Sequence, residues 1–173
     1  MIFFSADLHI AHANIIKYCN RPFKSLNEMN HTILDNYLKT VQDEDTVFLL
    51  GDLTIKRGSS SKKYISMIYN FLPGQKHLIK GNHDKYTKEF YKEECGFISV
   101  RKKISTSKYV LVHDPAHFSN MDLQSGKLLL HGHRHYLKPT DNLESSAKIY
   151  DVGVDANHFF PVSLGRIKEN FIE

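Results

Sequence analysis

The chain has few of the features that mark secreted or membrane-spanning proteins. Its 173 residues include only two cysteines, Cys19 and Cys95. Two are too few for a disulfide framework in a chain long enough to bury a core, so we expect unpaired cysteines in a reducing compartment. No apolar run approaches the roughly 18 residues needed to span a bilayer, and repeats, low-complexity tracts and linkers are lacking. These absences favour a soluble, cytoplasmic protein with no membrane partner.

A leader segment and a strongly charged surface are also not expected. Met1 runs directly into the apolar residues 2–4, which leaves no length for a removable secretory signal. The length fits one domain over residues 1–173, which would bury roughly 70% of the surface of the unfolded chain. The formal charge is only +4, and the one dense basic run is Arg101–Lys103. This balance favours an anionic substrate without requiring nucleic acid.

Short apolar runs alternate with helical patterns, which indicates an α/β domain. Helices are predicted after the capping pair Ser25 and Glu28, over residues 64–71 before Pro73-Gly74, and over residues 87–95 before Gly96. Buried strands are predicted at residues 2–6, 46–50, 77–80, 109–112, 128–130, 149–154 and 162–167.

Polar residues with metal-binding side chains follow five of these strands. They occur in the segments Asp7-Leu8-His9, Gly51-Asp52, Gly81-Asn82-His83-Asp84, His113-Asp114 and Gly132-His133-Arg134-His135. Loops that leave the carboxyl ends of strands in an open α/β sheet converge on one crevice. Residues far apart in the sequence are therefore expected to form one site.

The chemistry of this set predicts two divalent ions. Carboxylate, carboxamide and imidazole donors together suit Mn, Fe, Zn or similar ions such as Ni, with Mg also possible, and Mn is preferred here. One ion would leave several donors unused. Two ions with two aspartates leave a charge of about +2, which would attract a phosphate oxyanion. Glycines stand directly before ligands, where the backbone must turn sharply and approach the ions. The candidate ligands are Asp7, His9, Asp52, Asn82, His113, His133 and His135.

These five motifs, in this order, resemble those of calcineurin-like metallophosphoesterases. The segments Val152-Gly153-Val154-Asp155 and Pro161-Val162-Ser163 are also similar to those of small bacterial and phage-type members, which extends the resemblance over nearly the whole chain. The resemblance implies a four-layer α/β/β/α sandwich of two packed mixed sheets, with the metal site at the carboxyl ends of strands.

The resemblance also implies how the ligands are divided and which residues take part in catalysis. Asp52 would bridge the two ions. His83 would lie beside a bridging hydroxide and stabilise the transition state or protonate the leaving oxygen, and Asp84 would orient its ring. The first ion would be held by Asp7, His9, Asp52 and His135, and the second by Asp52, Asn82, His113 and His133.

Several residues keep two interpretations. His12, Asn14 and Arg21 are candidates for substrate binding, with helix capping or surface charge as the alternative. Arg134 faces either phosphate or solvent, and His131 is expected to support the site without binding metal. Where many relatives have an arginine after Gly-Asp, this chain has Lys56 and Arg57, so a phosphate contact there is left open. His113 is preceded by Val112, where the family commonly has glycine.

The predicted function is two-metal hydrolysis of a small phosphodiester or nucleotide-type compound by a bridging hydroxide. A nuclease is an alternative, in which Arg101–Lys103 and Tyr86 would contact the strand, and a phosphomonoesterase is another. A non-catalytic scaffold is the weakest alternative, because the chain keeps the whole ligand set together with His83.

Overall fold

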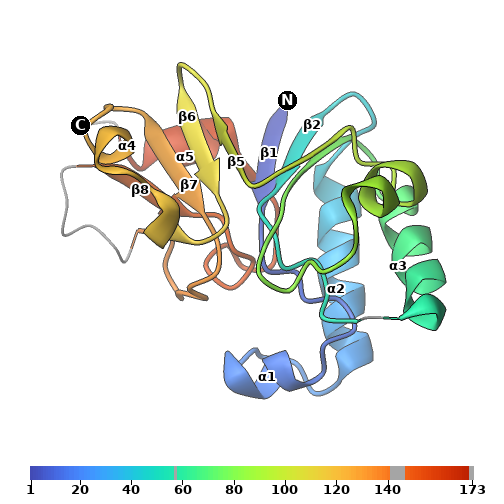
Figure 1. Ribbon diagram of the computed structural model, residues 1–173. Helices are drawn as coiled ribbons and strands as arrows, with labels where there is room; N and C mark the ends of the chain where they lie inside the picture. The colour runs from blue at the N-terminus through green and yellow to red at the C-terminus, as the bar shows by residue number, and fades with distance from the viewer. Residues whose placement is uncertain (57, 141–146, 172–173) are drawn as a thin grey trace.

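Two mixed β-sheets pack face to face in the computed structural model, which describes residues 1–56, 58–140 and 147–171 (Figure 1). The first sheet has the order β4-β3-β2-β1-β9, in which only β9 is antiparallel to its neighbour. Its strands are β1 (Ile2–Ser5), β2 (Thr46–Leu49), β3 (Gln75–Ile79), β4 (Ser99–Arg101) and β9 (Val162–Ser163). The second has the order β5-β6-β7-β8, in which only β5 is antiparallel. Its strands are β5 (Lys103–Ser105), β6 (Tyr109–Val112), β7 (Leu128–His131) and β8 (Lys148–Asp151).

The strands β1 and β2 of the first sheet carry apolar side chains on both faces, because each face is covered. Side chains alternate between the faces of a strand, so Phe3 and Val47 enter the core beneath the helices. Phe4 and Phe48 enter the core between the sheets, where their rings stack at 5.5 Å. Tyr109 from the second sheet meets Phe4 edge to face, with 5.6 Å between ring centroids. Aromatic packing therefore joins the two sheets.

Helices cover the outer faces unequally. The long helices α2 (Leu26–Thr40) and α3 (Ser59–Phe71) lie over the first sheet (Figure 1). The second sheet has a smaller cover, which includes the short helices η2 (Pro115–His117) and α4 (Asn120–Leu123). Phe118, which lies between these helices, packs against the outer core of that sheet. The predicted α/β/β/α class with two packed mixed sheets is confirmed, and its fourth layer is small.

The expected start of α2 is confirmed in part. Ser25 caps the helix, and its Oγ accepts a hydrogen bond from the backbone N–H of Glu28 at 3.1 Å. The Glu28 carboxylate accepts from the N–H of Lys24 at 2.7 Å, one residue earlier than in a standard capping box.

Other element predictions need correction. Residues 162–167 were expected to form one strand, but β9 ends at Ser163, whose Oγ accepts from the N–H of Arg166 and caps α5 (Leu164–Glu169). The third expected helix is the π-helical turn η1 (Phe90–Glu94), and α1 (Asn14–Tyr18) was not expected. The strands β4 and β5 have three residues each, which is too short for an alternating pattern to be recognised.

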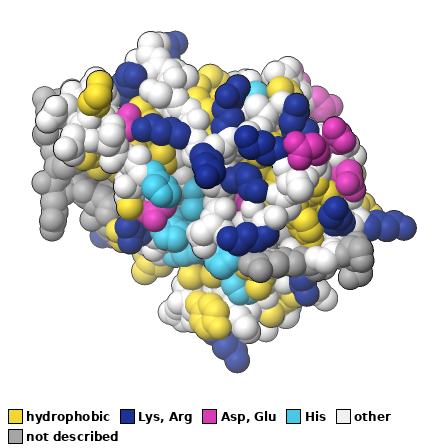
Figure 2. Space-filling view, viewed as in Figure 1, with side chains coloured by type: hydrophobic (Ala, Val, Ile, Leu, Met, Phe, Trp, Pro, Cys, Tyr) yellow, Lys and Arg dark blue, Asp and Glu magenta, His cyan; other side chains and the backbone are white. Residues whose placement is uncertain are grey.

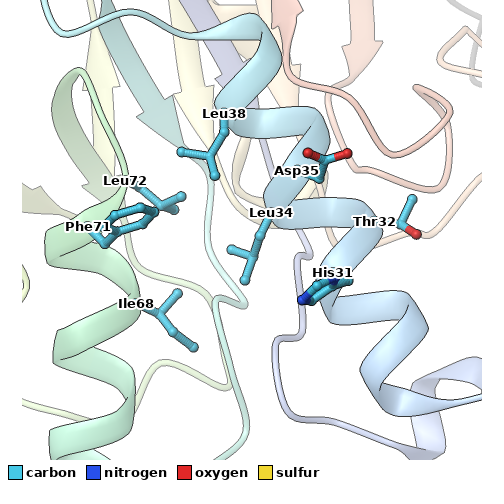
Figure 3. Close-up of a pocket in the computed structure, with 8 residues that line it drawn as sticks. All are labelled: His31, Thr32, Leu34, Asp35, Leu38, Ile68, Phe71 and Leu72. Atoms are coloured by element: carbon cyan, nitrogen blue, oxygen red, sulfur yellow. The ribbon is translucent and has the colours of Figure 1, made fainter.

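An apolar groove of about 440 Å³ lies between α2 and α3 (Figure 3). Leu34 and Leu38 line it from α2, and Ile68 and Phe71 line it from α3. We assign no chemistry to this groove, because aliphatic and aromatic side chains dominate its lining. Among the helices that the structure describes, none has the length and hydrophobicity needed to cross a bilayer.

Parallel strand order brings the metal-binding motifs to one edge. The strands β1, β2 and β3 run in the same direction side by side, as do β6, β7 and β8. An isolated parallel bridge between Ala6 and Gly153 links the segments that follow β1 and β8. The loops from both sheets therefore leave toward one shared region.

Candidate metal centre

The backbone turns into the left-handed region at the residues that carry the predicted ligands. Five of the seven have positive φ angles: Asp7 (57°), His9 (50°), Asp52 (53°), His133 (74°) and His135 (52°). This conformation costs a non-glycine residue on the order of 1–3 kcal/mol, and such residues cluster at functional sites. The turns direct side chains from several strand ends toward one another.

Two glycines allow these loops to approach closely. A Cβ atom at Gly51, which has a φ of 90°, would lie 2.5 Å from the nitrogen of Gly81 and 2.6 Å from Nδ1 of His113. A Cβ atom at Gly132 would lie 2.6 Å from Oδ2 of Asp7. A larger residue at either position would push apart the segments that carry the ligands.

The first ligand cluster consists of Asp7, His9 and His135, whose donor atoms lie within 4.8 Å of one another. Asp7 is fully buried, and its Oδ2 accepts a hydrogen bond from the N–H of His133 at 2.8 Å. Burial raises the pKa of Asp7 to about 6 and lowers the pKa of His9 to about 2. His9 is therefore neutral, the form in which imidazole binds a metal.

The second cluster consists of Asp52, His113 and His133, again with donor atoms within 4.8 Å. Asn82 joins it, because its Oδ1 lies 2.9 Å from Nε2 of His113 and 3.1 Å from Nδ1 of His133. Nδ1 of His113 lies 2.7 Å from the carbonyl oxygen of Leu50. That contact fixes Nδ1 as the protonated nitrogen and turns Nε2 toward the cluster.

Asp52 lies between the two clusters. Its Oδ2 is 3.7 Å from Nε2 of His9 in the first cluster and 3.4 Å from Nε2 of His113 in the second. Burial raises the pKa of Asp52, but the hydrogen bond with His113 and the nearby histidines outweigh burial and lower it to about 2. Asp52 is therefore ionised, and it has the position expected of a bridging carboxylate.

Buried atoms without partners show that the clusters fit cations. Among the described residues, Oδ1 of Asp7 and Nε2 of His9 are buried with no hydrogen-bond partner. A buried polar atom without a partner lowers the stability of the fold unless a ligand binds to it. Nε2 of His113 and Oδ1 of Asn82 lie 2.9 Å apart, and Nδ1 of His113 is already engaged by the carbonyl oxygen of Leu50. A cation that displaces the proton of Nε2 would therefore find two acceptor atoms side by side.

The electrostatics of the site attract positive charge. Burial lowers the pKa of His113 and of His135, but hydrogen bonds to Asp52 and to Asp155 outweigh burial and raise the two values to about 9 and about 10. Protons are thus held where the ligand sets would hold metal ions. Metal binding would displace them, as is general for histidine ligands.

Arg21 and Asp155 support the first cluster from behind. Oδ2 of Asp155 lies 2.8 Å from Nδ1 of His135, which fixes the orientation of that ring. Both oxygens of Asp155 accept from the Arg21 guanidinium at 2.8 Å, and that guanidinium also donates to the carbonyl oxygens of Asp7 and Leu8. The Arg21 side chain is completely buried. Its predicted contact with substrate is therefore wrong, because its donors are used within the protein.

The role predicted for Asp84 also needs correction. Asp84 was expected to orient the His83 ring, but its buried carboxylate accepts from three backbone amides instead. Oδ2 accepts from Asp52 and Gly81 at 2.9 and 2.8 Å, and Oδ1 accepts from Leu53 at 3.0 Å. Asp84 thus ties the loop after β3 to the loop after β2. It fixes the backbone of Asp52.

A cavity of about 500 Å³, here called the metal-site cavity, opens over the two clusters. Histidine side chains gather in a hollow on the face shown in Figure 2. The cavity is lined by His9, His12, Ile15, Tyr18, Asp52, Ile55, Asn82, His83, His133 and His135.

The remaining candidates lie at different distances from this cavity. His12 lines it and is mostly buried, with its Nδ1 3.1 Å from Nδ1 of His9. His83 lines it with 39% of its side chain exposed. Asn14 is exposed at the start of α1 and is not a lining residue. Arg134 is half-exposed, 3.5 Å from Asp114, and also lies outside the lining.

Two further expectations concern residues near the site. His131 is fully buried, and its Nδ1 lies 2.8 Å from the carbonyl oxygen of Gly132, the residue that precedes His133. This contact agrees with a supporting role. Lys56 is exposed and does not line the metal-site cavity. Arg57, the other candidate for a phosphate contact there, lies outside the described residues.

Two packed mixed sheets with an Asp/His centre at their strand ends define the class of metallophosphoesterases. The family model described as calcineurin-like phosphoesterase matches residues 1–161. An uncharacterised protein of Methanocaldococcus jannaschii is 34% identical over 96% of this chain and 88% of its own length. The gene 66 protein of Mycobacterium phage D29 is 26% identical over 99% of this chain and 97% of its own.

A solved structure agrees with these sequence relatives. The crystal structure of a protein of unknown function from Aquifex aeolicus matches with a TM-score of 0.73 and 30% identity, and covers 99% of both chains. The chain belongs to the calcineurin-like phosphoesterase family, as its motifs predicted. Its family and its two Asp/His clusters support metal-dependent phosphoester hydrolysis.

The contacts of Asp84 predict that Asp84→Asn destabilises the fold. An asparagine would turn an NH₂ group toward a backbone N–H, so we expect the free energy of unfolding to fall by about 1–3 kcal/mol. Urea unfolding measures this loss. The control Asp35→Asn removes an exposed pair with Lys39 and should cost at most about 0.5 kcal/mol. In a double-mutant cycle, coupling between Asp84 and His83 above about 0.5 kcal/mol would contradict the assignment.

Proposed function

We propose that the protein is a phosphodiesterase that holds two divalent ions and acts on small phosphodiesters of the nucleotide type. The observation that carries this proposal is the position of Asp52, whose Oδ2 lies 3.7 Å from His9 and 3.4 Å from His113. One carboxylate oxygen within reach of both clusters supports a shared ligand. Asp7, His9 and His135 would complete the first site, and Asn82, His113 and His133 the second.

Mn is the ion we propose, because nitrogen and oxygen donors are mixed and no thiolate is present among the clustered residues. When bound, the two ions would supply an activated water near neutral pH and positive charge for the phosphate oxygens. The protein contributes the fixed geometry. Asp84 and Arg21 hold the loops, and Asp155 orients His135.

His83 is the proposed catalytic residue. Its backbone N–H donates to Oδ1 of Asp52 at 2.9 Å, which places the residue beside the bridging position. Within the described chain, its imidazole forms no hydrogen bond, and Nε2 lies 3.9 Å from Oδ2 of Asp52. The ring is therefore available to a phosphoryl oxygen or a leaving group in the cavity. In this position it can donate a proton or a hydrogen bond as negative charge develops.

The lining of the metal-site cavity favours a diester over a monoester. Among the residues that the structure describes, no arginine or lysine lines it, so this part of the lining offers no fixed cation for the second charge of a monoester. Ile15, Tyr18 and Ile55 also line it, and their apolar surfaces suit the organic group of an ester. Free Cys19 and Cys95 support the proposed location in the cytoplasm.

Activity should depend on metal and on Asp52. We expect chelation to abolish hydrolysis of bis(p-nitrophenyl) phosphate and Mn to restore it. Because Asp52 reaches both clusters, Asp52→Ala should lose both ions, whereas His135→Ala should lose mainly one. Elemental analysis of dialysed protein measures the ions per chain, and unfolding temperature with and without Mn gives an independent readout. Full activity in verified metal-free protein, or equal metal content in wild type and Asp52→Ala, would sink this assignment.

Diester hydrolysis should exceed monoester hydrolysis with the same metal. The test compares kcat/KM for bis(p-nitrophenyl) phosphate and p-nitrophenyl phosphate in the Mn-loaded protein. We expect the larger kcat/KM for the diester, because the described lining of the metal-site cavity has no lysine or arginine to hold the second charge of a monoester. A large excess of monoester hydrolysis would identify a phosphomonoesterase instead.

Replacing His83 should affect the rate and leave the ions in place. We expect His83→Asn to lower kcat/KM by roughly 10²- to 10⁴-fold, the usual contribution of a general acid. The loss should shrink for good leaving groups if His83 protonates the leaving oxygen, and stay constant if it stabilises phosphoryl charge. A series of aryl diesters separates these cases, and His31→Asn on the exposed face of α2 is the matched control. A wild-type rate, or loss of an ion, would refute the role.

A further inference from the structure

A second cavity, here called the lysine cavity, adjoins the metal centre on the side away from α1. It measures about 580 Å³ and shares Asn82 and His133 with the metal-site cavity, while His113 lines only the lysine cavity. The proposed second metal position is therefore accessible from both cavities. A substrate bound at the ions can extend in either direction.

Four lysines and one further histidine surround this second space. Lys80 directly follows β3, Lys85 follows the His83-Asp84 motif, and Lys102 and Lys103 lie where the chain passes from β4 to β5. His117 belongs to η2. Figure 2 shows Lys and Arg side chains gathered beside the histidines. Segments from both sheets thus contribute positive charge to one cavity.

The carboxylates that face this cavity are already bound. Asp84 accepts from three backbone amides. Lys103 pairs at 2.5 Å with Asp122, which lies outside the cavity lining. Asp114 accepts from the N–H of Ala116 and lies 3.6 Å from His133. Within the described residues, neither Lys85 nor Lys102 forms an ion pair with a carboxylate. Their charges remain available to a ligand.

One of these lysines has a fixed position. Lys80 donates to the carbonyl oxygen of Tyr86 at 2.7 Å. Clustered like charges destabilise a fold unless an anion neutralises them. A purely structural role would require partner carboxylates, and those present are already bound.

We propose that the lysine cavity binds a second phosphate of a substrate whose first phosphate lies at the metal centre. This inference rests on the proposed function and specifies its substrate as a compound with at least two phosphates. The second phosphate is either a terminal phosphate of a small molecule or the next phosphodiester of a strand. Both present the same oxyanion to Lys85 and Lys102, which bind phosphate as point charges.

Thymidine dinucleotides provide a direct test. TpT has one phosphodiester, and pTpTp adds a phosphate at each end. In the Mn-loaded protein we expect kcat/KM for pTpTp to exceed that for TpT by about threefold to tenfold, because each exposed lysine–phosphate contact contributes a modest amount. The ratio should fall toward 1 in Lys85→Gln/Lys102→Gln. It should keep its wild-type value in the charge-matched control Lys148→Gln/Lys168→Gln, whose exposed lysines line neither cavity.

Binding to metal-free protein separates failure of the cavity from failure of the proposed function. In EDTA at low salt, calorimetry should give a lower Kd for pTpTp than for TpT, and the difference should vanish in Lys85→Gln/Lys102→Gln. Such binding supports the lysine cavity even if no hydrolysis is found. Equal affinity for the two dinucleotides, or a preference that survives in the double variant, would overturn the proposal.

Oligothymidylates without terminal phosphates distinguish the two sources. If kcat/KM rises only when terminal phosphates are present, the substrate is a small polyphosphorylated compound. If kcat/KM rises from TpT to TpTpT and this rise depends on Lys85 and Lys102, the substrate is a strand. Either result supports binding of a second phosphate, and the lack of any gain in both series contradicts it.

Discussion

The left-handed backbone at the strand ends is the constraint on which the rest of the site depends. Asp7, His9, Asp52, His133 and His135 all have positive φ angles, and each carries a candidate ligand. A regular continuation of β1 or β2 would carry these residues onward along the strand direction instead of turning them toward one another. The turns instead bring them to one point between the sheets. The local strain is therefore part of how the fold builds the site.

Buried polar contacts hold these turns in place. Asp84 accepts from the amides of Asp52 and Gly81 and so joins two loops, while Arg21 donates to the carbonyl oxygen of Asp7 and to Asp155. These contacts orient the ligands but leave Oδ1 of Asp7 and Nε2 of His9 without partners in the described structure. The result is a rigid site with unsatisfied donor atoms, which is what a metal centre requires before its ions bind.

The sequence indicated which residues would come together, because strand ends are visible in it: six of the seven predicted ligands lie in the two Asp/His clusters. Each apolar run ends at a motif, and parallel order then brings the motifs together. It could not predict the contact between Arg21 and Asp155, which are 134 residues apart and meet only through tertiary packing. Adjacency of His83 and Asp84 was misleading, because consecutive side chains there point to different surroundings.

The lysine cavity is another feature that the linear sequence does not reveal. Only Arg101–Lys103 forms a basic run, and Lys80 and Lys85 join it through the pairing of β3 with β4. Tyr86, considered as an exposed stacking residue, packs against Phe90 with ring centroids 4.5 Å apart. The surface next to the two Asp/His clusters is thus more basic than the linear sequence indicates, although the net charge is only +4.

We infer that one carboxylate, Asp52, joins two metal positions formed by the strand-end turns. A crystal structure of the protein grown with Mn, with anomalous difference density measured for the ion, tests this inference. We expect two anomalous peaks, one beside Asp7, His9 and His135 and one beside Asn82, His113 and His133, with an Asp52 oxygen between them. A single peak, or peaks not contacted by Asp52, would contradict it.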